Sequence, residues 1–481
     1  MYAQQHGERV FYWVSLARTA MIPVALLGTY LIWNIGRRFY GAKSGSLAAT
    51  LWVLSPTVLT FGASISPDVT AAVFGLLAAW RLYIWLRLGT DWSAFLLGIA
   101  SGLAMLSKAS WLILPPIIVG LTSWYAYRAR KHWVWGKRLK QTGVVAGTCW
   151  LFIHGGYEFQ GVLRPLGDFE FVSQTLRGDT SEGDISAVSA NRFRGSWLAR
   201  LPAPLPADYI RGIDIQKRDF EGRMDSYFLG RWRDHGWLHY YAVAVFLKEP
   251  LAIWVIAIAG WGWRLVSRTR VSESRTARVS QLLVFAPGIT MFVFVSCQTG
   301  FNHHLRYVLP FFPCLYLLVA APLSRISRPL ASVCVGLACW YAVSSLSAMP
   351  RTYSFFTEAI GGSENGWKYI GDSNLDWGQD LLTAKRWIEA NPGKRPVYMV
   401  YDVRTDFKML GMEAVDGRGF VTPEGPTRSG WWIVTQYPLL RNENRWFRKH
   451  SPTERLSVTT SVFQITDAPE IAPPSANEPQ R

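Results

Sequence analysis

The chain has 481 residues, of which half are hydrophobic and only 17% are charged, and it contains 24 tryptophans. This mixture is far from that of an ordinary soluble enzyme. The formal net charge is +17, but the basic residues lie mainly in short links between apolar runs, and no polar segment carries a basic stripe with interleaved aromatic residues. The composition therefore indicates a membrane protein and excludes a nucleic-acid partner.

Several apolar runs have about the length that a helix needs to cross hydrocarbon. They include residues 21–35, 71–86, 243–263, 282–295 and 330–346. Inside lipid the backbone must satisfy its own hydrogen bonds, so these runs should be helices. We therefore predict a polytopic α-helical membrane protein with about ten transmembrane helices.

Basic links predict the cytoplasmic side of the membrane, because short cytoplasmic links are enriched in Lys and Arg. Two apolar segments separate each basic cluster from the next, so every cluster can face the cytoplasm. The clusters are Arg37, Arg38 and Lys43; Arg81 and Arg87; Arg128, Arg130, Lys131, Lys137, Arg138 and Lys140; Arg264, Arg268, Arg270, Arg275 and Arg278; and Arg325 and Arg328.

The outer face then receives the links around Asp68 and Lys108, the segment 157–237, the link at 303–306 and everything beyond Pro350. Counting back one span from the first basic cluster places Met1 on the outer face. We therefore expect the chain to lack an earlier helix and the outer loop that would follow it.

The long outer segment, residues 157–237, is amphipathic and irregular, so we expect it to lie over the outer membrane surface. Four prolines interrupt it: Pro165, Pro202, Pro204 and Pro206. Aromatic residues from Trp237 to Phe246 then predict a short interfacial helix that ends before Pro250 and leads into the next span.

Residues 350–467 have the pattern of a soluble α/β domain on the outer face, after a transmembrane domain at 1–349. We expect Asp376 to cap a helix that runs to Glu389. Strands rich in β-branched and aromatic residues at 396–401, 431–436 and 458–465 should form a small sheet against that helix. The tail, 468–481, is rich in Pro, Ser, Asn and Glu and is expected to be disordered.

Two ionisable residues stand at the outer ends of predicted spans, where such groups are candidates for function. The Asp68 carboxylate can meet water, a metal or a sugar there, although it can also cap the helix that starts at Pro67. Lys108 interrupts an apolar stretch, where it can hold a phosphate or extend to the lipid headgroups. We take Asp68 as the candidate catalytic residue and Lys108 as a candidate phosphate-binding residue.

The link at 301–307 adds polar donors at the mouth of another span. Arg306 offers a fork suited to phosphate oxygens. For His303 and His304 we favour hydrogen bonding over metal ligation, because neighbours in sequence seldom aim at one ion. His235 and Lys248 complete the substrate-binding candidates, although surface solvation explains them equally well. No residue is assigned as a metal ligand, and a divalent cation is left open as a cofactor.

Residues 372–380, with the sequence DSNLDWGQD, superficially resemble a calcium loop. Trp377 stands where such a loop needs glycine, and Thr383 replaces the closing glutamate. We interpret the stretch as a turn and helix cap that braces the outer domain against the membrane portion. The five cysteines show no metal-ligand spacing either.

Taken together and in order, these residues resemble the phospholipid-carrier-dependent glycosyltransferases of the GT-C superfamily, the relatives of protein O-mannosyltransferases and aminoarabinose lipid A transferases. Passages at 16–41, 54–68, 236–250 and 304–310 carry the likeness. The passage 372–381 is similar to one found after the last span in many bacterial members. Each motif is short, but the resemblance covers most of the chain.

The resemblance implies transfer of a sugar from a polyprenyl or dolichyl phosphate to a hydroxyl of a protein, lipid or glycan acceptor on the outer face of a membrane, taken to be a bacterial inner membrane. It implies Asp68 as the second acidic residue of the site and Lys108 and Arg306 as phosphate partners. The family's principal acidic residue lies in the first outer loop, which we expect to be missing here. An inactive chain is therefore one expectation.

Two alternative functions stay open. A transporter or lipid flippase would have a similar composition, but it should place ionisable residues near the bilayer midplane and show repeated halves. Neither feature is evident in the sequence. A non-catalytic relative of the transferases is the other alternative, and the loss of the first outer loop would favour it.

Overall fold

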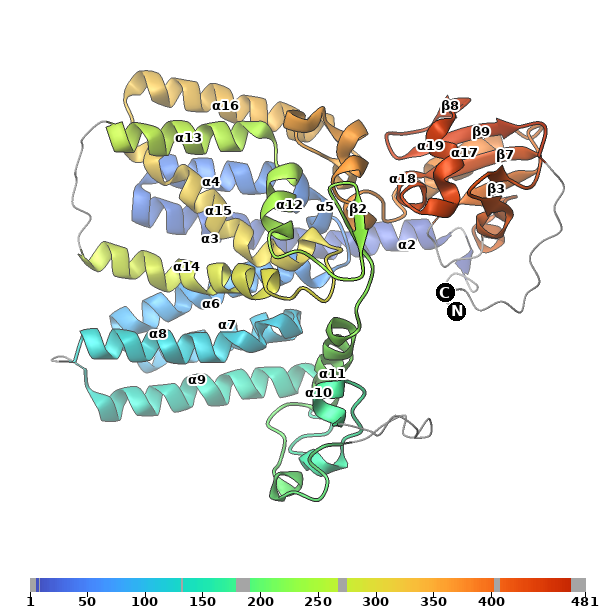
Figure 1. Ribbon diagram of the computed structural model, residues 1–481. Coiled ribbons are helices and arrows are strands. Elements are labelled where there is room, and N and C mark those ends of the chain that lie inside the picture. Colours follow the sequence, from blue (N-terminus) through green and yellow to red (C-terminus); the bar gives the residue numbers. More distant parts are fainter. Residues whose placement is uncertain are drawn as a thin grey trace.

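The computed structural model describes residues 6–7, 9–130, 133–178, 191–266, 275–401 and 407–468. Most of these residues belong to helices that lie alongside one another in a bundle, and a small sheet domain stands at one end of that bundle (Figure 1). Of the predicted features, Lys131, Arg268, Arg270 and the tail from residue 469 onward lie outside the described residues. The side chains of Arg325 and Arg328 lie outside them as well.

The helices follow the apolar runs of the sequence, and short 3₁₀ segments lead into α3, α8 and α15. In chain order they are α2 (Arg9–Arg18), α3 (Ile22–Tyr40), α4 (Ala42–Leu54), α5 (Pro56–Gly62), α6 (Pro67–Leu88), α7 (Asp91–Ser107), η2 (Ala109–Ile113), α8 (Leu114–Arg128), α9 (Trp135–Gly156), α10 (Gln174–Arg177), α11 (Ala207–Glu221), α12 (Tyr240–Lys248), α13 (Leu251–Val266), α14 (Arg275–Ser296), η5 (Leu305–Phe311), α15 (Phe312–Ala320) and α16 (Arg328–Ser347).

Within the described ranges, six helical segments are long and apolar enough to cross a membrane. Two bent pairs, α4 with α5 and α12 with α13, raise that number to eight if each pair is one span. The shorter apolar helix α7 packs along α9. The protein is thus mostly helical with several candidate spans, and the count of about ten stays a prediction.

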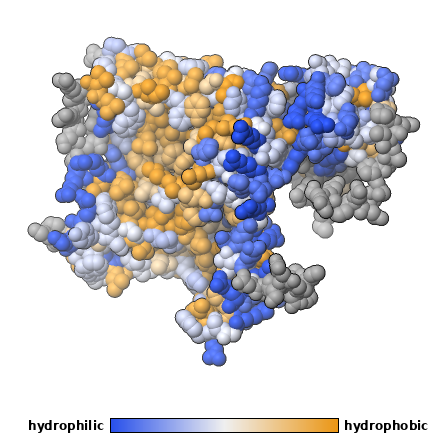
Figure 2. Space-filling model, in the orientation of Figure 1, coloured by the Kyte–Doolittle hydropathy of each residue, from blue (hydrophilic) through white to orange (hydrophobic). Residues whose placement is uncertain are grey.

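The surface of the bundle has the distribution of side chains that a membrane protein needs. Figure 2 shows an apolar band over the helices and hydrophilic residues over the sheet domain and the segments beside it. Large apolar side chains are exposed in this part of the molecule, among them Leu26, Ile258, Val293 and Val335. An apolar surface of this extent is typical of contact with lipid, so the protein is a multi-pass membrane protein.

The basic links gather at one end of the bundle, as the predicted topology requires. The helices α8 and α13 end there, and α9 and α14 begin there (Figure 1, left). The sheet domain and α12 stand at the opposite end. Which end faces the cytoplasm remains a prediction.

The predicted interfacial helix is α12, and the chain turns by 103° between α12 and α13. Pro250 lies at the break, because proline cannot continue the helical hydrogen bonding. Beside it Glu249 is fully buried and accepts hydrogen bonds from the hydroxyls of Ser55 (2.7 Å), Tyr316 (3.1 Å) and Tyr341 (2.8 Å). A buried carboxyl group without such partners would cost free energy. The hydrogen bonds to Glu249 therefore stabilise the packing of the four helical segments that supply these side chains.

The segment 157–237 is irregular, as predicted. It contains α10, α11 and a hairpin of β1 (Ser226–Phe228) and β2 (Arg231–Arg233). A small core of Phe169, Phe171 and Ala203 holds its first part together. The segment extends beside the bundle (Figure 1, green), and its position over a membrane surface stays a prediction.

The C-terminal part contains a five-stranded sheet with the strand order β4-β3-β7-β9-β8. Its elements are α17 (Leu381–Ala390), β3 (Val397–Val400), β4 (Val415–Asp416), β7 (Gly430–Thr435), β8 (Glu454–Arg455) and β9 (Thr460–Ile465), with the minor pair β5 (Val421–Thr422) and β6 (Gly425–Pro426) and the short helices α18 (Gln436–Leu439) and α19 (Arg445–Lys449). The three predicted strands correspond to β3, β7 and β9. The predicted helix packs on them through Ala384, Trp387 and Ile388.

The predicted cap of that helix is wrong. The helix α17 begins at Leu381, and Asp380, not Asp376, occupies the N-cap position. Asp376 instead accepts a hydrogen bond from the backbone N–H of Gly378 (3.0 Å). The positive φ of Gly378, 88°, is outside the helical range, so the helix cannot start before it.

The segment that follows the predicted domain boundary at residue 350 packs against the helices. Phe356, Ile370 and Leu375 pack into the helix core, whereas the sheet cores begin with residues of α17. The segment 351–375 therefore lies against the bundle, and the domain limits stay a prediction.

Asp380 connects the sheet to this segment. Its carboxylate accepts hydrogen bonds from the hydroxyls of Thr459 and Thr460 and from Nε of Arg351 at 2.9 Å. Burial alone would raise the pKa of Asp380, but hydrogen bonds from Ser457 and Thr459 and the charge of Arg351 outweigh burial and lower that pKa. A carboxylate whose pKa is lowered by folding stabilises the fold at pH values above its ordinary pKa. This contribution is lost as the pH falls through the pKa of the folded state.

We expect Asp380→Asn to lower the free energy of unfolding at pH 7 by about 2 kcal/mol, because it removes a charged acceptor from buried donors. This change is measured by thermal unfolding, with cleavage of the sheet domain by a protease as the signal for the unfolded state. Below about pH 4 the difference from the wild type should shrink, since Asp380 is then protonated on unfolding. Asp416→Asn is the matched control, because Asp416 is a half-exposed carboxylate paired with Arg418; an equal effect of both substitutions would contradict the prediction.

Candidate active site

Asp68 lies in the first turn of α6, at the end of the bundle that faces the sheet domain (Figure 1). Pro67 occupies the start of this helix, where its fixed φ is favourable. Ser66 is the N-cap residue, so the alternative in which Asp68 caps the helix is wrong. The Asp68 side chain is almost fully buried, and the positive end of the helix dipole favours a carboxylate at this position.

Two cations from other parts of the chain meet this carboxylate. Nζ of Lys108, between α7 and η2, lies 2.7 Å from Oδ1, and a terminal nitrogen of Arg306, in η5, lies 3.6 Å from Oδ2. The side chains of Lys108 and Arg306 are 12% and 19% exposed, against 2% for Asp68. The structure thus brings three of the predicted site residues together, with the two cations closer to solvent than the carboxylate.

This cluster has a net positive charge and unused hydrogen-bonding capacity. Burial lowers the pKa of Lys108, and the charge of Asp68 opposes that effect. Within the described part of the chain, Oδ2 of Asp68 and Nε of Arg306 are buried without a hydrogen-bond partner. An anion that reached Lys108 and Arg306 would therefore meet free positive charge and at least one free donor.

His303 and His304 face a different carboxylate, Asp372. Their Nδ1 atoms lie 3.7 Å and 3.6 Å from its two oxygens. Nε2 of His303 is 2.7 Å from the backbone carbonyl oxygen of Asp225, and Nδ1 of His304 hydrogen-bonds with the hydroxyl of Ser373. Both histidines therefore make the hydrogen bonds that the sequence favours.

His304 also belongs to the electrostatic surroundings of the cluster. Burial is the largest cause that lowers the pKa of His304, to about 2, and the charges of Arg306, His303 and Lys108 add to it. Its imidazole is therefore neutral at physiological pH. Because Nδ1 faces Asp372 and Ser373, the proton should be on Nδ1, which leaves Nε2 as an acceptor.

The segment 372–377 closes the site from the side of the sheet domain. The guanidinium carbon of Arg306 lies 4.5 Å from the centre of the Trp377 ring, and Oδ1 of Asn374 accepts a hydrogen bond from the backbone N–H of Leu305 (3.0 Å). Sequence reasoning placed a bracing turn here but missed Asp372 and Trp377 as neighbours of the site. The density of polar residues in DSNLDWGQD was the available signal.

The remaining two candidates do not touch Asp68. Lys248 is buried and its Nζ donates hydrogen bonds to the backbone carbonyls of Tyr353 and Asn374, each at 2.8 Å. It therefore holds the segment after α16 in place. His235 is on the surface, where its Nδ1 lies 2.6 Å from Asp234.

An apolar groove of about 420 Å³ begins at Lys108 and Tyr307. Its other walls come from η2, α8, α11 and α14 and include Ile113, Pro116, Ile213, Phe220, Phe294 and Val295. The groove joins an apolar surface to a cation of the cluster, which is the arrangement that a lipid with a charged head requires.

Among the described residues, no group of three or more His, Cys, Asp or Glu side chains is arranged to hold a metal ion. The adjacent histidines hydrogen-bond to protein groups.

The sequence pattern of the family described as dolichyl-phosphate-mannose-protein mannosyltransferase matches residues 14–153 of this chain. The predicted resemblance to these glycosyltransferases is confirmed. The matched part runs from α2 to α9 and includes Asp68 and Lys108. No curated protein matches the sequence at a significant level.

Two solved structures are similar to the whole chain at low sequence identity. The structure of ArnT from Cupriavidus metallidurans bound to undecaprenyl phosphate has a TM-score of 0.45 and 14% identity, and the match covers 99% of this chain and 89% of that one. The structure of the same protein in the apo state has a TM-score of 0.42 and 13% identity, with 93% and 83% coverage.

The cluster predicts unequal effects of single and double substitutions on stability. We expect Asp68→Asn to lower the free energy of unfolding by about 3 kcal/mol, because it leaves two partly buried cations without a counter-charge. Lys108→Met should cost less, since Arg306 remains beside Asp68. The double variant should be less destabilised than the sum of the two single variants. Thermal unfolding in detergent measures all three, and strictly additive effects would show that Asp68 and Lys108 do not interact.

Proposed function

We propose that this protein transfers a sugar from a polyprenyl phosphate to an acceptor hydroxyl at the cluster of Asp68, Lys108 and Arg306. The observation that carries the proposal is the convergence of two cations from distant helical segments on one buried carboxylate, at the mouth of an apolar groove. The match of residues 14–153 to a family named for a dolichyl-phosphate-linked donor supports the same reaction class.

The donor has an apolar chain and a charged phosphate, and the site offers a partner for each. The prenyl chain would enter the groove beside Lys108, and the phosphate oxygens would bind to Lys108 and Arg306. Asp68 would hold both cations in position before the donor arrives. Cations placed where negative charge develops on the leaving phosphate lower the barrier to its departure.

The acceptor hydroxyl needs a group that takes its proton. His304 is poorly suited, because burial lowers its pKa to about 2. Asp68 is the remaining candidate, and within the described residues its Oδ2 makes no hydrogen bond. A phosphate that drew Lys108 and Arg306 toward itself would uncover this carboxylate for the acceptor.

In the proposed step, the acceptor oxygen forms a bond to the anomeric carbon while its proton moves to the carboxylate of Asp68. The bond between that carbon and the phosphate oxygen breaks, and its electron pair stays on the polyprenyl phosphate, next to Lys108 and Arg306.

We further propose the outer face of a bacterial inner membrane for the cluster, the segment 157–237 and the sheet domain. The acceptor would be a protein, a lipid or a glycan that reaches the membrane surface there. The charged groups of the Asp68 cluster lie at one end of the bundle rather than midway along it. This position favours an enzyme over a transporter with a central binding site.

The donor assignment can be tested with the full chain in lipid nanodiscs and a panel of undecaprenyl and dolichyl phosphate hexoses. We expect at least one donor to release polyprenyl phosphate, detected by mass spectrometry. Lys108→Gln should raise KM for that donor by about 10-fold to 100-fold, because it removes one charged contact to the phosphate. If the wild type released no polyprenyl phosphate from any donor of either class, the proposed function would be wrong.

The proton acceptor can be tested on a donor that the wild type uses. We expect Asp68→Asn to lower kcat by roughly 10²-fold to 10⁴-fold, because it removes the general base. The rate is measured at a temperature at which the variant is folded, since the substitution also destabilises the protein. His304→Gln is the comparison, and it should lower kcat far less, because His304 is too weak a base to take the proton. An unchanged kcat in Asp68→Asn would remove Asp68 from the reaction.

A further inference from the structure

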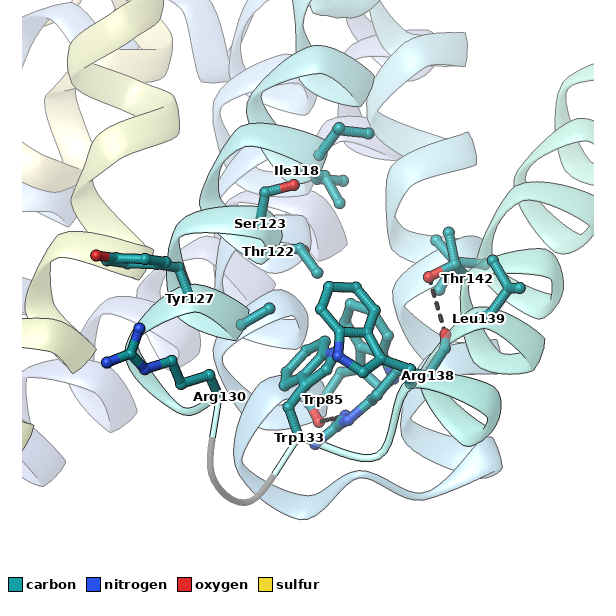
Figure 3. A pocket seen from close by; sticks show the side chains of 14 residues that line it. Trp85, Ile118, Thr122, Ser123, Tyr127, Arg130, Trp133, Arg138, Leu139 and Thr142 are labelled. Carbon is teal, nitrogen blue, oxygen red and sulfur yellow. Dashed lines mark hydrogen bonds between the residues drawn. The ribbon is translucent and has the colours of Figure 1, made fainter.

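A second cavity, of about 390 Å³, lies at the opposite end of the bundle from the Asp68 cluster. Figure 3 shows it between α8, which supplies Ile118, Thr122 and Ser123, and the start of α9, with Trp85 of α6 and Trp133 at its base. Apart from a few hydroxyls and the two arginines at its edge, the lining is apolar and aromatic. The cavity therefore suits a ligand that is mainly apolar.

Two polar atoms in this apolar wall have no partner. Oγ1 of Thr122 and Nε1 of Trp133 are both buried and make no hydrogen bond within the described part of the chain. Both residues line the cavity. Because buried donors are normally satisfied, these two indicate that the natural occupant carries hydrogen-bond acceptors.

Two cations, Arg130 and Arg138, line the cavity. Among the described residues, neither of them forms an ion pair with a carboxylate. Arg138 is held by hydrogen bonds to the backbone carbonyls of Trp85 (3.0 Å) and Leu86 (3.2 Å), which leave its charge uncompensated. The occupant should therefore be an anion as well.

The base of the cavity is held firmly, so the cavity does not depend on its occupant for its shape. Gln141 of α9 donates a hydrogen bond to the carbonyl of Gly89 (2.9 Å) and accepts one from Nε1 of Trp85 (3.1 Å). The guanidinium of Arg138 also lies 4.8 Å from the Trp133 ring centre. The end of α6 and the start of α9 are thus fixed to one another beneath the cavity.

We propose that this cavity binds one anionic phospholipid of the surrounding membrane. Its acyl chain lies against the apolar wall, its ester or phosphate oxygens accept hydrogen bonds from Thr122 and Trp133, and its headgroup charge lies beside Arg130 and Arg138. Basic pockets between membrane helices on the cytoplasmic side are known to hold such headgroups. The site is separate from the proposed sugar transfer and does not rest on it.

Native mass spectrometry of the purified full chain, supplied with equal amounts of phosphatidylglycerol and phosphatidylcholine, tests the proposal. We expect one retained phosphatidylglycerol. The variant Arg130→Gln should weaken its retention by roughly five-fold, for one lost charge. The Arg130 side chain is exposed, so the thermal stability of the variant without added lipid should equal that of the wild type.

Two further variants distinguish binding in the cavity from attraction to exposed positive charge in general. Arg37→Gln removes one exposed charge from the last turn of α3, and it should retain phosphatidylglycerol as the wild type does. Ser123→Trp, which places a large side chain into the cavity without a change of charge, should lose it. Equal retention of the two lipids, equal losses in both arginine variants, or displacement of phosphatidylglycerol by undecaprenyl phosphate would each overturn the proposal.

Discussion

The arrangement of the site depends on one buried carboxylate that two cations share. Removing Asp68, Lys108 and Arg306 from water costs free energy, and their mutual attraction offsets this cost only if the geometry is good. The three residues come from α6, from the break between α7 and η2, and from η5. The positions of these three segments are therefore coupled through the charges at their ends.

The segment after the last helix of the bundle holds η5 in place. Lys248 binds two of its backbone carbonyls, and Asn374 binds the backbone of Leu305. Asp380 then connects the same segment to the sheet through Thr459 and Thr460. A chain of hydrogen bonds thus runs from the sheet domain to the neighbourhood of Arg306, which explains why a polar stretch such as DSNLDWGQD stands at this position.

The two ends of the bundle offer different binding chemistry to lipids. At one end a groove leads to Lys108, whose charge is partly compensated by Asp68. At the other end a cavity has cations at its edge that no carboxylate compensates. The same physical requirement, an apolar wall next to a positive charge, underlies both the proposed donor site and the proposed phospholipid site.

The sequence by itself determined the membrane class, most of the helices, the three main strands and the identity of the charged residues in the cluster. Hydrophobic runs and local periodicity are properties of neighbouring residues, so they can be read without a fold. The start of α17 was misplaced, because the preference of Asp376 for a cap could not reveal that Gly378 interrupts the helix.

Only the tertiary structure decided which charged residues meet. Asp68 and Lys108 are 40 positions apart, and Arg306 lies far beyond both, so no local pattern could pair them. The same holds for Asp372 beside His304 and for Lys248 on the carbonyls of a later segment. Such contacts arise from how helices pack, because packing alone brings the ends of distant segments within the few ångströms over which charges and hydrogen bonds act.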